Sequence, residues 1–352
     1  MFLLFRLLLL LCLQRIQSQR TVSSIYHLLK GKKSIQTIQD SYLFKISNLF
    51  GVYPTLNRNE FDREILTLER KQYIKTNGQE NIATLTEDGL DYLEVLESNF
   101  SPLYFNGLKL EREPEKLLQI IYLLTQTTSY LATKQNRFLP IIDDVDTQKV
   151  VKQYIKGTNL SMEETLAKIH DDLIKALTIF SPNVSELIVD TFTTPRQTGQ
   201  TSFQLADKYK MSVQDIHLHI HHFAHYIYQQ YTSGRLFQYL TFVYSREQES
   251  TVLTSSAKQT LTLFKKGFGI SDIAHLRKLK TATIEDHIIE LIYAVDKFDW
   301  QRFITKDMFQ MIRNVIEDKQ TVKLKILKNS LPEDITYFQI KLGLALYHKG
   351  EK

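Results

Sequence analysis

The stretch that decides the fold is GISDIAHLRKLKTATIEDHIIELI, residues 269–292. Its central part, IAHLRKLKTATIEDHI (273–288), aligns without a gap with LADKYKMSVQDIHLHI (205–220). The same residue types recur at the same steps of both segments. The matched pairs are Ala206 and Ala274, Lys210 and Lys278, Ile216 and Ile284, His219 and His287, and Ile220 and Ile288. The chain therefore contains an internal repeat.

The repeat has the spacing of two helices joined by a short turn. A small residue on the first helix, Ala206 or Ala274, lets the second helix cross closely. An apolar residue, Ile216 or Ile284, then anchors the second helix in the core. We predict a helix-turn-helix at 273–288, and 201–230 is the candidate for a second one.

The turn itself departs from the usual pattern. Lysine stands in both copies where a helix-turn-helix normally has glycine, and a lysine at positive φ costs about 1 kcal/mol more than glycine. Ser212 and Thr281 lie where the second helix needs an N-cap, a role that serine and threonine fill well.

Composition points to a helical protein in a reducing compartment. The 352 residues include 12 Gly and 7 Pro, and so few helix breakers favour long helices. The net charge of +5 permits an acidic partner without requiring one. Cys12, the single cysteine, has no partner for an internal disulfide, which favours a cytoplasmic location.

The N-terminus carries an apolar run, residues 2–13, interrupted by Arg6. A signal peptide is one interpretation, but no basic region precedes the run and no small-residue cleavage site follows it. The run is also shorter than the roughly 20 residues needed to cross a bilayer. We therefore expect a buried first helix and no membrane association.

Three regions follow from the pattern of helices and turns. Residues 1–98 combine helices with a short hairpin, in which Asn77-Gly78 suits a tight turn, and a last helix begins after Leu-Thr-x-x-Gly, ending at Gly89. This order resembles a winged-helix domain. Residues 99–250 are helical, with Ser161 and Glu164 forming a capping box. A polar junction at 247–256 leads to a helical region, 255–347.

The fold class predicted is therefore mainly α. It is a multi-domain helical protein with an N-terminal winged-helix-like unit, containing a small β hairpin, and a C-terminal helix-turn-helix domain.

Residues 255–347 resemble the helix-turn-helix domain at the C-terminus of many RecQ-type helicases. The stretch at 269–292 carries this resemblance, together with LPEDITYFQIKLGLALYHKG (331–350). With RTVSSIYHLLKGKKSIQTIQDSYLF (20–44) and Leu49-Phe50-Gly51, the whole chain resembles the YpbB family. Those proteins are bacterial, of low-GC Gram-positive type, and typically encoded beside a RecQ-family helicase. The resemblance implies a helicase-associated accessory protein.

The candidate DNA-contacting residues cluster around the turn of the second copy. Helix-turn-helix proteins present the start of the second helix to base edges and basic residues to phosphates. The residues that fit these roles are Lys265, Lys266, Arg277, Lys278, Lys280, Thr281 and Thr283. Glu285 and Asp286 would repel phosphate, and no Arg, Asn or Gln at the helix start offers bidentate base contacts. Non-specific binding is therefore favoured over sequence reading.

Other basic residues are candidates for a wider groove. They are Lys30, Lys32 and Lys33 near the N-terminus and Lys319, Lys323, Lys325 and Lys328 near the C-terminus.

Signatures of catalysis are missing. The chain has no G-x-x-x-x-G-K-[ST] loop and no G-x-S-x-G motif. Asp143, Asp144 and Asp146 allow a magnesium site, but the start of a solvated helix explains them better. Five histidines within 217–225 allow a metal site or a pH-sensitive surface, yet neutral histidines on a partly buried helix fit as well. We expect no enzyme activity, cofactor, metal or small-molecule substrate.

The function expected is a DNA-binding or helicase-associated accessory protein that assists a RecQ-family helicase, with DNA and that helicase as partners. One alternative is a transcription regulator that binds specific DNA through the winged-helix and helix-turn-helix units. Another is a scaffold without affinity for nucleic acid, because a fold alone does not determine function.

Overall fold

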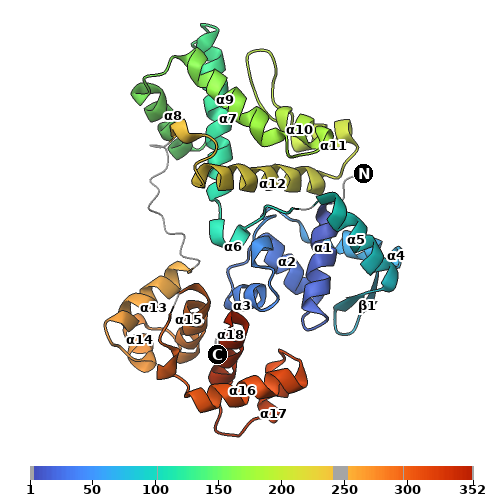
Figure 1. Ribbon diagram of the computed structural model, residues 1–352, viewed down its shortest axis with the longest axis vertical. Helices are drawn as coiled ribbons and strands as arrows, with labels where there is room; N and C mark the ends of the chain where they lie inside the picture. The colour runs from blue at the N-terminus through green and yellow to red at the C-terminus, as the bar shows by residue number, and fades with distance from the viewer. Residues whose placement is uncertain (1–3, 101, 241–252, 296, 351–352) are drawn as a thin grey trace. The chain divides into compact units, whose positions relative to one another are not determined.

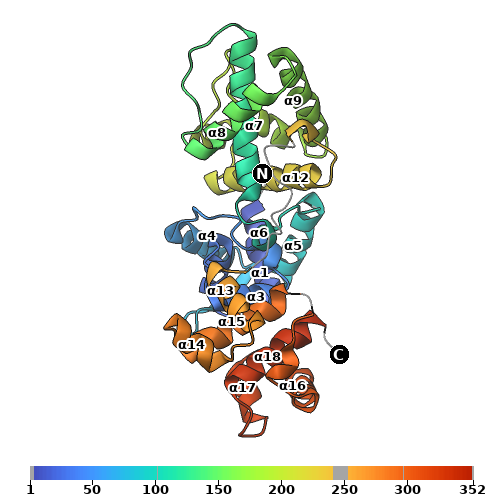
Figure 2. The same cartoon turned by 90° about the vertical axis from the view of Figure 1, so that its left-hand side faces the viewer.

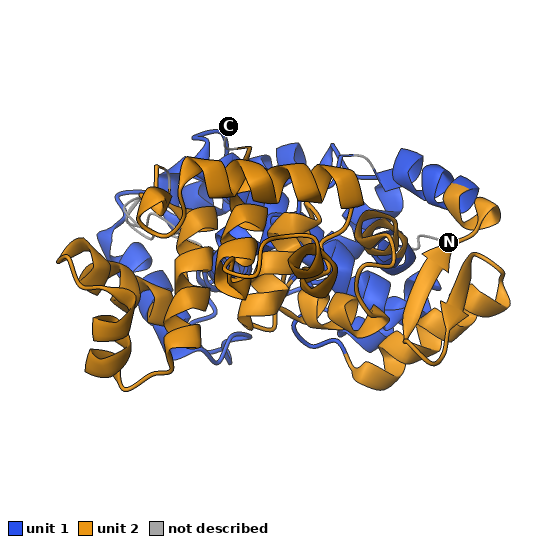
Figure 3. Cartoon of the chain, turned by 90° about the horizontal axis from the view of Figure 1, so that it is seen from below, with its two compact units in different colours: residues 1–9, 52–56, 91–250 blue, residues 10–51, 57–90, 251–352 orange. Residues whose placement is uncertain are grey.

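The computed structural model describes residues 4–100, 102–240, 253–295 and 297–350. Contacts group the described residues into two compact units, each built from segments that are distant in sequence (Figure 3). Unit 1 takes its residues from 1–9, 52–56 and 91–250, and unit 2 from 10–51, 57–90 and 251–352. Most of the predicted junction at 247–256 lies outside the described residues. The predicted division into three regions along the sequence stays a prediction.

Unit 1 is a helical assembly around α7 (Figure 1). The long α7 packs against α8, α9 and α12, and α12 also packs against α10 and α11. The helices are α6 (Gly107–Leu110), α7 (Glu113–Ala132), α8 (Val145–Gly157), α9 (Met162–Leu177), α10 (Pro182–Val189), α11 (Ser202–Tyr209) and α12 (Val213–Thr232), with a 3₁₀ turn η2 (Gln238–Leu240).

The starts of these helices follow their sequence signals. Ser161 accepts a hydrogen bond from the Glu164 amide at 3.1 Å, and the Glu164 carboxylate accepts one from the Ser161 amide at 2.8 Å. The predicted capping box is confirmed. Asp144 caps α8 by accepting from the Thr147 amide at 2.7 Å. The acidic cluster at 143–146 is thus a helix start, as the simpler interpretation held.

The first half of unit 2 has the predicted winged-helix-like elements. The helices are α2 (Val22–Lys30), α3 (Ile35–Leu43) and α4 (Arg58–Arg70), with a 3₁₀ turn η1 (Ser47–Leu49). The strands β1 (Ile74–Asn77) and β2 (Ile82–Leu85) pair antiparallel, with Ile74 opposite Leu85 and Asn77 opposite Ile82. α5 (Glu87–Phe100) follows the hairpin, and its residues from Asp91 onward belong to unit 1. The predicted mainly α fold with one small hairpin is confirmed.

The hairpin turn differs from the tight Asn77-Gly78 turn expected from sequence. Because Asn77 pairs with Ile82, four residues, 78–81, form the loop. Asn81 takes the left-handed conformation, φ 52°, which asparagine tolerates. The Asn77 side chain accepts a hydrogen bond from the Gln79 amide at 3.2 Å instead of forming the tight turn.

The Leu-Thr-x-x-Gly motif has a direct structural reason. The Thr86 hydroxyl donates to the Gln72 carbonyl at 2.6 Å and accepts from the Gly89 amide at 3.0 Å, so it links the hairpin to the start of α5. A Cβ on Gly89 would lie 1.9 Å from the Tyr73 carbonyl oxygen. Only glycine allows this approach.

Among the residues described in 253–350, the second half of unit 2 contains helices and no strands. Its cores are formed by buried side chains such as Ile273, Ile284, Ile288 and Leu342. The helices are α13 (Ser255–Lys265), α14 (Ile270–Arg277), α15 (Thr281–Ala294), α16 (Lys306–Lys319), α17 (Leu324–Asn329) and α18 (Tyr337–Lys349), with a 3₁₀ turn η3 (Trp300–Arg302).

Within unit 2, the N-terminal helix α3 packs against α15 and α18 (Figures 1 and 2). The rings of Tyr42 and Tyr293 stack with centroids 4.5 Å apart and planes 2° from parallel. The side chain of Glu290, also on α15, is buried and accepts hydrogen bonds from the amide and hydroxyl of Thr254 at the start of α13. The second helix of the helix-turn-helix is therefore held from several sides along its C-terminal half.

The apolar N-terminal run forms α1 (Leu4–Ile16), whose leucines and Cys12 are largely inaccessible to solvent. The expectation of a buried first helix is confirmed. No helix within the described ranges is both long enough and apolar enough to span a bilayer.

Candidate nucleic-acid interface

The segment 270–294 forms a helix-turn-helix. α14 ends at Arg277, Lys278 adopts φ 53° and ψ 42°, and α15 begins at Thr281. The Leu279 amide donates to the Ala274 carbonyl at 2.9 Å and closes the turn. Ala274 and Ile284 are buried, as the spacing predicted.

The segment 202–232 repeats this geometry. Lys210 adopts φ 53° and ψ 41°, and the Met211 amide donates to the Ala206 carbonyl at 3.1 Å. Both predicted motifs are therefore present, each with a left-handed lysine where glycine is usual. Ser212 caps α12 by accepting from the Asp215 amide at 3.0 Å, as predicted.

The predicted N-cap of the second copy is wrong by one residue. Lys280 is the N-cap of α15 and makes no side-chain cap, and Thr281 is the first helical residue. The ungapped alignment already places Lys280, and not Thr281, opposite Ser212.

The rim formed by the turn and the start of α15 is open to solvent. Lys278, Lys280, Thr281 and Ala282 are exposed, and Thr283 is half-buried. Among the residues that the structure describes, neither Lys278 nor Lys280 forms an ion pair with an acidic side chain. Two unpaired ammonium groups therefore flank the helix start that a helix-turn-helix offers to a duplex.

Lys265 and Lys266 are exposed at the other end of α14. They close α13, ahead of Gly267 at φ 93°. The eight residues of α14, about 12 Å long at 1.5 Å per residue, lie between the turn that follows these lysines and Lys278. The first helix of such a motif crosses the DNA backbone, so lysines at both ends of α14 suit phosphate contacts.

Arg277 points away from this rim. Its guanidinium donates to the Ser256 carbonyl at 2.9 Å, to the Gln259 side chain at 3.0 Å and to the Thr260 hydroxyl. The Thr260 hydroxyl also hydrogen-bonds His287 Nδ1 at 2.9 Å. Burial, and then the charge of Arg277, lower the pKa of His287. Arg277 thus joins α13 to α14, a role that no local pattern indicated.

The acidic residues on α15 are partly compensated. Lys341 on α18 forms an ion pair with Asp286 at 2.9 Å. Burial and the neighbouring Asp286 raise the pKa of Glu285. The repulsion of phosphate expected from Glu285 and Asp286 is therefore weaker than the sequence indicated. Local sequence does not reveal this compensation, because Lys341 lies far along the chain.

The lysines of the first copy are exposed but paired with acidic side chains. Asp215, near the start of α12, is buried and accepts a hydrogen bond from the Phe5 amide at 3.0 Å. Lys208 pairs with Asp190, and Lys210 pairs with Asp207 at 3.0 Å. This copy has the shape of the motif, but its two exposed lysines are each paired with an aspartate.

Three histidines of α12, His219, His222 and His225, are buried rather than open to solvent. His222 Nε2 accepts from the Tyr104 amide at 2.9 Å, and His225 Nδ1 accepts from the Asn106 amide at 3.3 Å. Burial lowers the pKa of each to about 3. The hypothesis of a pH-sensitive surface is wrong for these residues. No group of three or more metal-ligating side chains occurs in the described segments.

The other basic candidates have separate surroundings. Lys328 donates to the carbonyls of Glu333 and Ile335 at 2.8 and 2.6 Å, so its ammonium group holds the loop between α17 and α18. Lys319 pairs with Asp318 at 3.0 Å. Lys323 and Lys325 are exposed, and Lys32 lines a cavity next to α2 and α3.

Comparison with known proteins agrees with this geometry. Residues 256–344 match a helix-turn-helix domain family, a class that suggests DNA binding. Protein YpbB of Bacillus subtilis (strain 168) is 28% identical over 348 residues, covering 97% of both chains. No solved structure matches. The chain is thus similar to protein YpbB over nearly the whole of both chains, and its C-terminal region is a helix-turn-helix domain.

Proposed function

We propose that this protein is a non-catalytic accessory factor that binds DNA non-specifically through the helix-turn-helix at 270–294. The observation that carries the proposal is the exposed, unpaired state of Lys278 and Lys280 beside the solvent-open start of α15. Lysines placed against phosphates release counterions, which supplies most of the free energy of non-specific DNA binding.

The residue types on the rim favour backbone contact over base reading. Thr281, Ala282 and Thr283 have short side chains, and none offers the paired donor and acceptor that recognise a guanine or adenine edge. Threonine hydroxyls donate to phosphate oxygens instead. We therefore expect binding without a consensus sequence.

Salt-dependent fluorescence anisotropy on a labelled duplex tests this proposal. Replacing both Lys278 and Lys280 by Gln should weaken binding and reduce the slope of log K against log salt by about 2, one unit for each lost phosphate contact. Lys208→Gln with Lys210→Gln is the matched control, because these lysines belong to the first copy and are paired with Asp190 and Asp207. Equal losses in the two double variants would contradict the proposal.

The proposed helicase partner has a different basis. It rests on the resemblance of the chain to the YpbB family and of its C-terminal domain to that of RecQ-type helicases, and on the absence of an ATPase motif from the sequence. Co-purification of the full chain from its own cells tests it, and recovery of no helicase or DNA-repair protein would refute it. A selected consensus from random-sequence DNA would instead favour the transcription regulator.

A further inference from the structure

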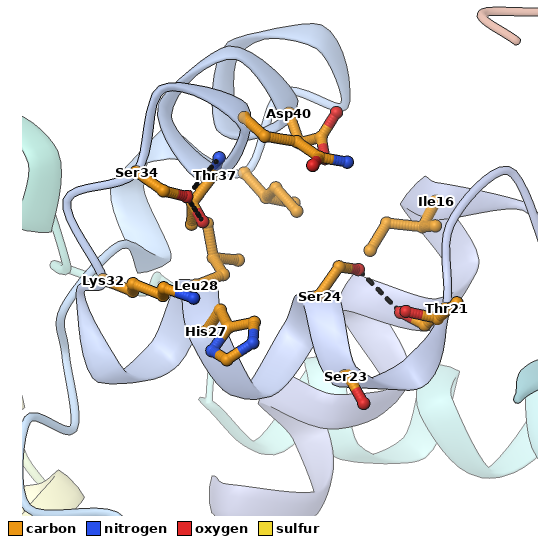
Figure 4. A pocket seen from close by; sticks show the side chains of 12 residues that line it. Ile16, Thr21, Ser23, Ser24, His27, Leu28, Lys32, Ser34, Thr37 and Asp40 are labelled. Carbon is orange, nitrogen blue, oxygen red and sulfur yellow. Dashed lines mark hydrogen bonds between the residues drawn. The ribbon is translucent and has the colours of Figure 1, made fainter.

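Unit 2 contains a polar cavity between α2 and α3 that the DNA-binding surface does not use. Its volume is about 250 Å³. A water molecule occupies about 30 Å³ in the liquid, so the cavity holds the equivalent of about eight waters, the size of a small polar metabolite. Hydroxyl groups of both helices line it, including those of Ser24, Ser34 and Thr37 (Figure 4).

One side of the cavity is positively charged. Figure 4 shows His27 and Lys32 together on this side. Neither side chain has a hydrogen bond or ion pair with any residue that the structure describes. Burial lowers the pKa of His27, and among its charged neighbours Lys32 lowers it most, so the Lys32 ammonium acts directly on this ring. A bound anion would favour the charged forms of both groups.

On the opposite side of the cavity, the carboxylate of Asp40 is paired with Arg20. Asp40 is buried and receives hydrogen bonds from Arg20 Nε at 3.0 Å to both carboxylate oxygens, with Arg20 Nη2 at 2.9 Å. Its charge is therefore matched by Arg20 and does not cancel that of Lys32. The carboxylate still offers lone pairs to a hydroxyl group across the cavity.

We propose that this cavity binds a small phosphomonoester, with the phosphate against Lys32 and His27 and the ligand hydroxyls toward Asp40. Lysine, imidazole and hydroxyl donors are suited to a dianionic phosphate. The same chemical group occurs in a free metabolite and at the 5′ end of a DNA strand. An internal phosphodiester carries a single negative charge and a nucleotide on each side, whereas a terminal phosphate is dianionic, so the Lys32 ammonium and the hydroxyl donors favour the terminal group.

Isothermal titration of the full-length protein with inorganic phosphate and with glycerol 3-phosphate tests the proposal. We expect saturable binding, weakened about tenfold in Lys32→Met and in His27→Asn, which corresponds to about 1.4 kcal/mol. Lys30→Met is the matched control. Lys30 lies two residues from Lys32, does not line the cavity, and donates to the Tyr26 hydroxyl at 3.2 Å. The affinity of the Lys30→Met variant for the phosphate probes should stay within about twofold of the parent.

A second comparison separates the two sources of the phosphate. A single-stranded oligonucleotide with a 5′-phosphate is titrated beside the same strand with a 5′-hydroxyl. A Lys32-dependent preference for the phosphorylated strand would assign the site to strand ends, and binding of glycerol 3-phosphate alone would assign it to a metabolite. Absence of binding by all phosphate probes up to about 10 mM, or an equal loss in Lys30→Met, would overturn the proposal. DNA binding by Lys278 and Lys280 would be unaffected by that result.

Discussion

At the residue scale, neighbouring basic residues of the helix-turn-helix have opposite roles. Arg277 is tied into unit 2 by hydrogen bonds to α13, whereas Lys278, the next residue, is exposed in the left-handed conformation. Charge alone does not distinguish them. Their directions differ because Arg277 still belongs to α14 and Lys278 has left it.

The left-handed conformation of Lys278 makes stability and DNA binding separable. Lys278→Gly should stabilise the protein by up to about 1 kcal/mol, because glycine adopts φ 53° without steric cost. The same change removes a phosphate contact and should weaken DNA binding. Urea unfolding and anisotropy measure the two effects. Lys278→Ala, which loses the charge but keeps the strain, should weaken binding without stabilising the fold.

Replacing Arg277 should instead lower the stability of the protein and leave DNA binding unchanged. Arg277→Met removes the donors to Ser256, Gln259 and Thr260 and should destabilise the protein by about 1–3 kcal/mol. Under conditions where the variant is folded, the salt slope of DNA binding should match that of the parent. A slope reduced by about one unit would show that Arg277 does reach phosphate.

At the scale of elements, α12 is held to the segment at 104–106 by neutral histidines. His222 and His225 can accept from the Tyr104 and Asn106 amides only when one ring nitrogen of each is unprotonated. Since the folded pKa of each is about 3 and the ordinary value is 6.5, the unfolded chain binds protons first as the pH falls. Their contribution to stability is full above pH 6.5 and decreases toward the folded pKa.

Acidification should therefore destabilise unit 1. Between about pH 7 and pH 5, each of these histidines should reduce the free energy of unfolding by up to about 2 kcal/mol, from 1.36 kcal/mol per pKa unit. Urea titrations at both pH values, followed by circular dichroism, measure the change. His225→Gln, which keeps an acceptor that does not titrate, should show a smaller pH dependence. An unchanged dependence would place the titrating groups elsewhere.

At the scale of the whole molecule, unit 2 joins the two ends of the chain. The helix α3, from the N-terminal winged-helix-like part, packs on α15 and α18 of the C-terminal domain. The stacked rings of Tyr42 and Tyr293 lie in this contact. The start of α15 stays exposed while its remainder is held, which is the arrangement that a rigid binding helix requires.

Loss of the stack between Tyr42 and Tyr293 should therefore destabilise α15, although Tyr42 itself lies on α3. Tyr42→Ala should reduce the free energy of unfolding by about 1–3 kcal/mol, through lost burial and lost ring contact. Tyr337→Ala is the control, because Tyr337 is 50% exposed at the start of α18. Native-state hydrogen exchange of α15 reports the effect. Equal protection of α15 in both variants would show that the stack does not support the helix.

The sequence by itself determined the features that depend on residues close along the chain. The capping box at Ser161, the hairpin and the helix-turn-helix spacing are all local, because the residues that define each lie within a short segment of the chain. The left-handed lysines were also foreseeable from the missing glycine.

The tertiary structure alone decided which parts of these motifs are usable. Asp286 is paired with Lys341, 55 residues away, and the buried Asp215 of the first copy accepts from the amide of Phe5, 210 residues away. Neither contact leaves a periodic trace in the sequence. Pairing between distant segments is a property of packing, so only the folded chain separates the unpaired Lys278 and Lys280 from Lys208, which pairs with Asp190.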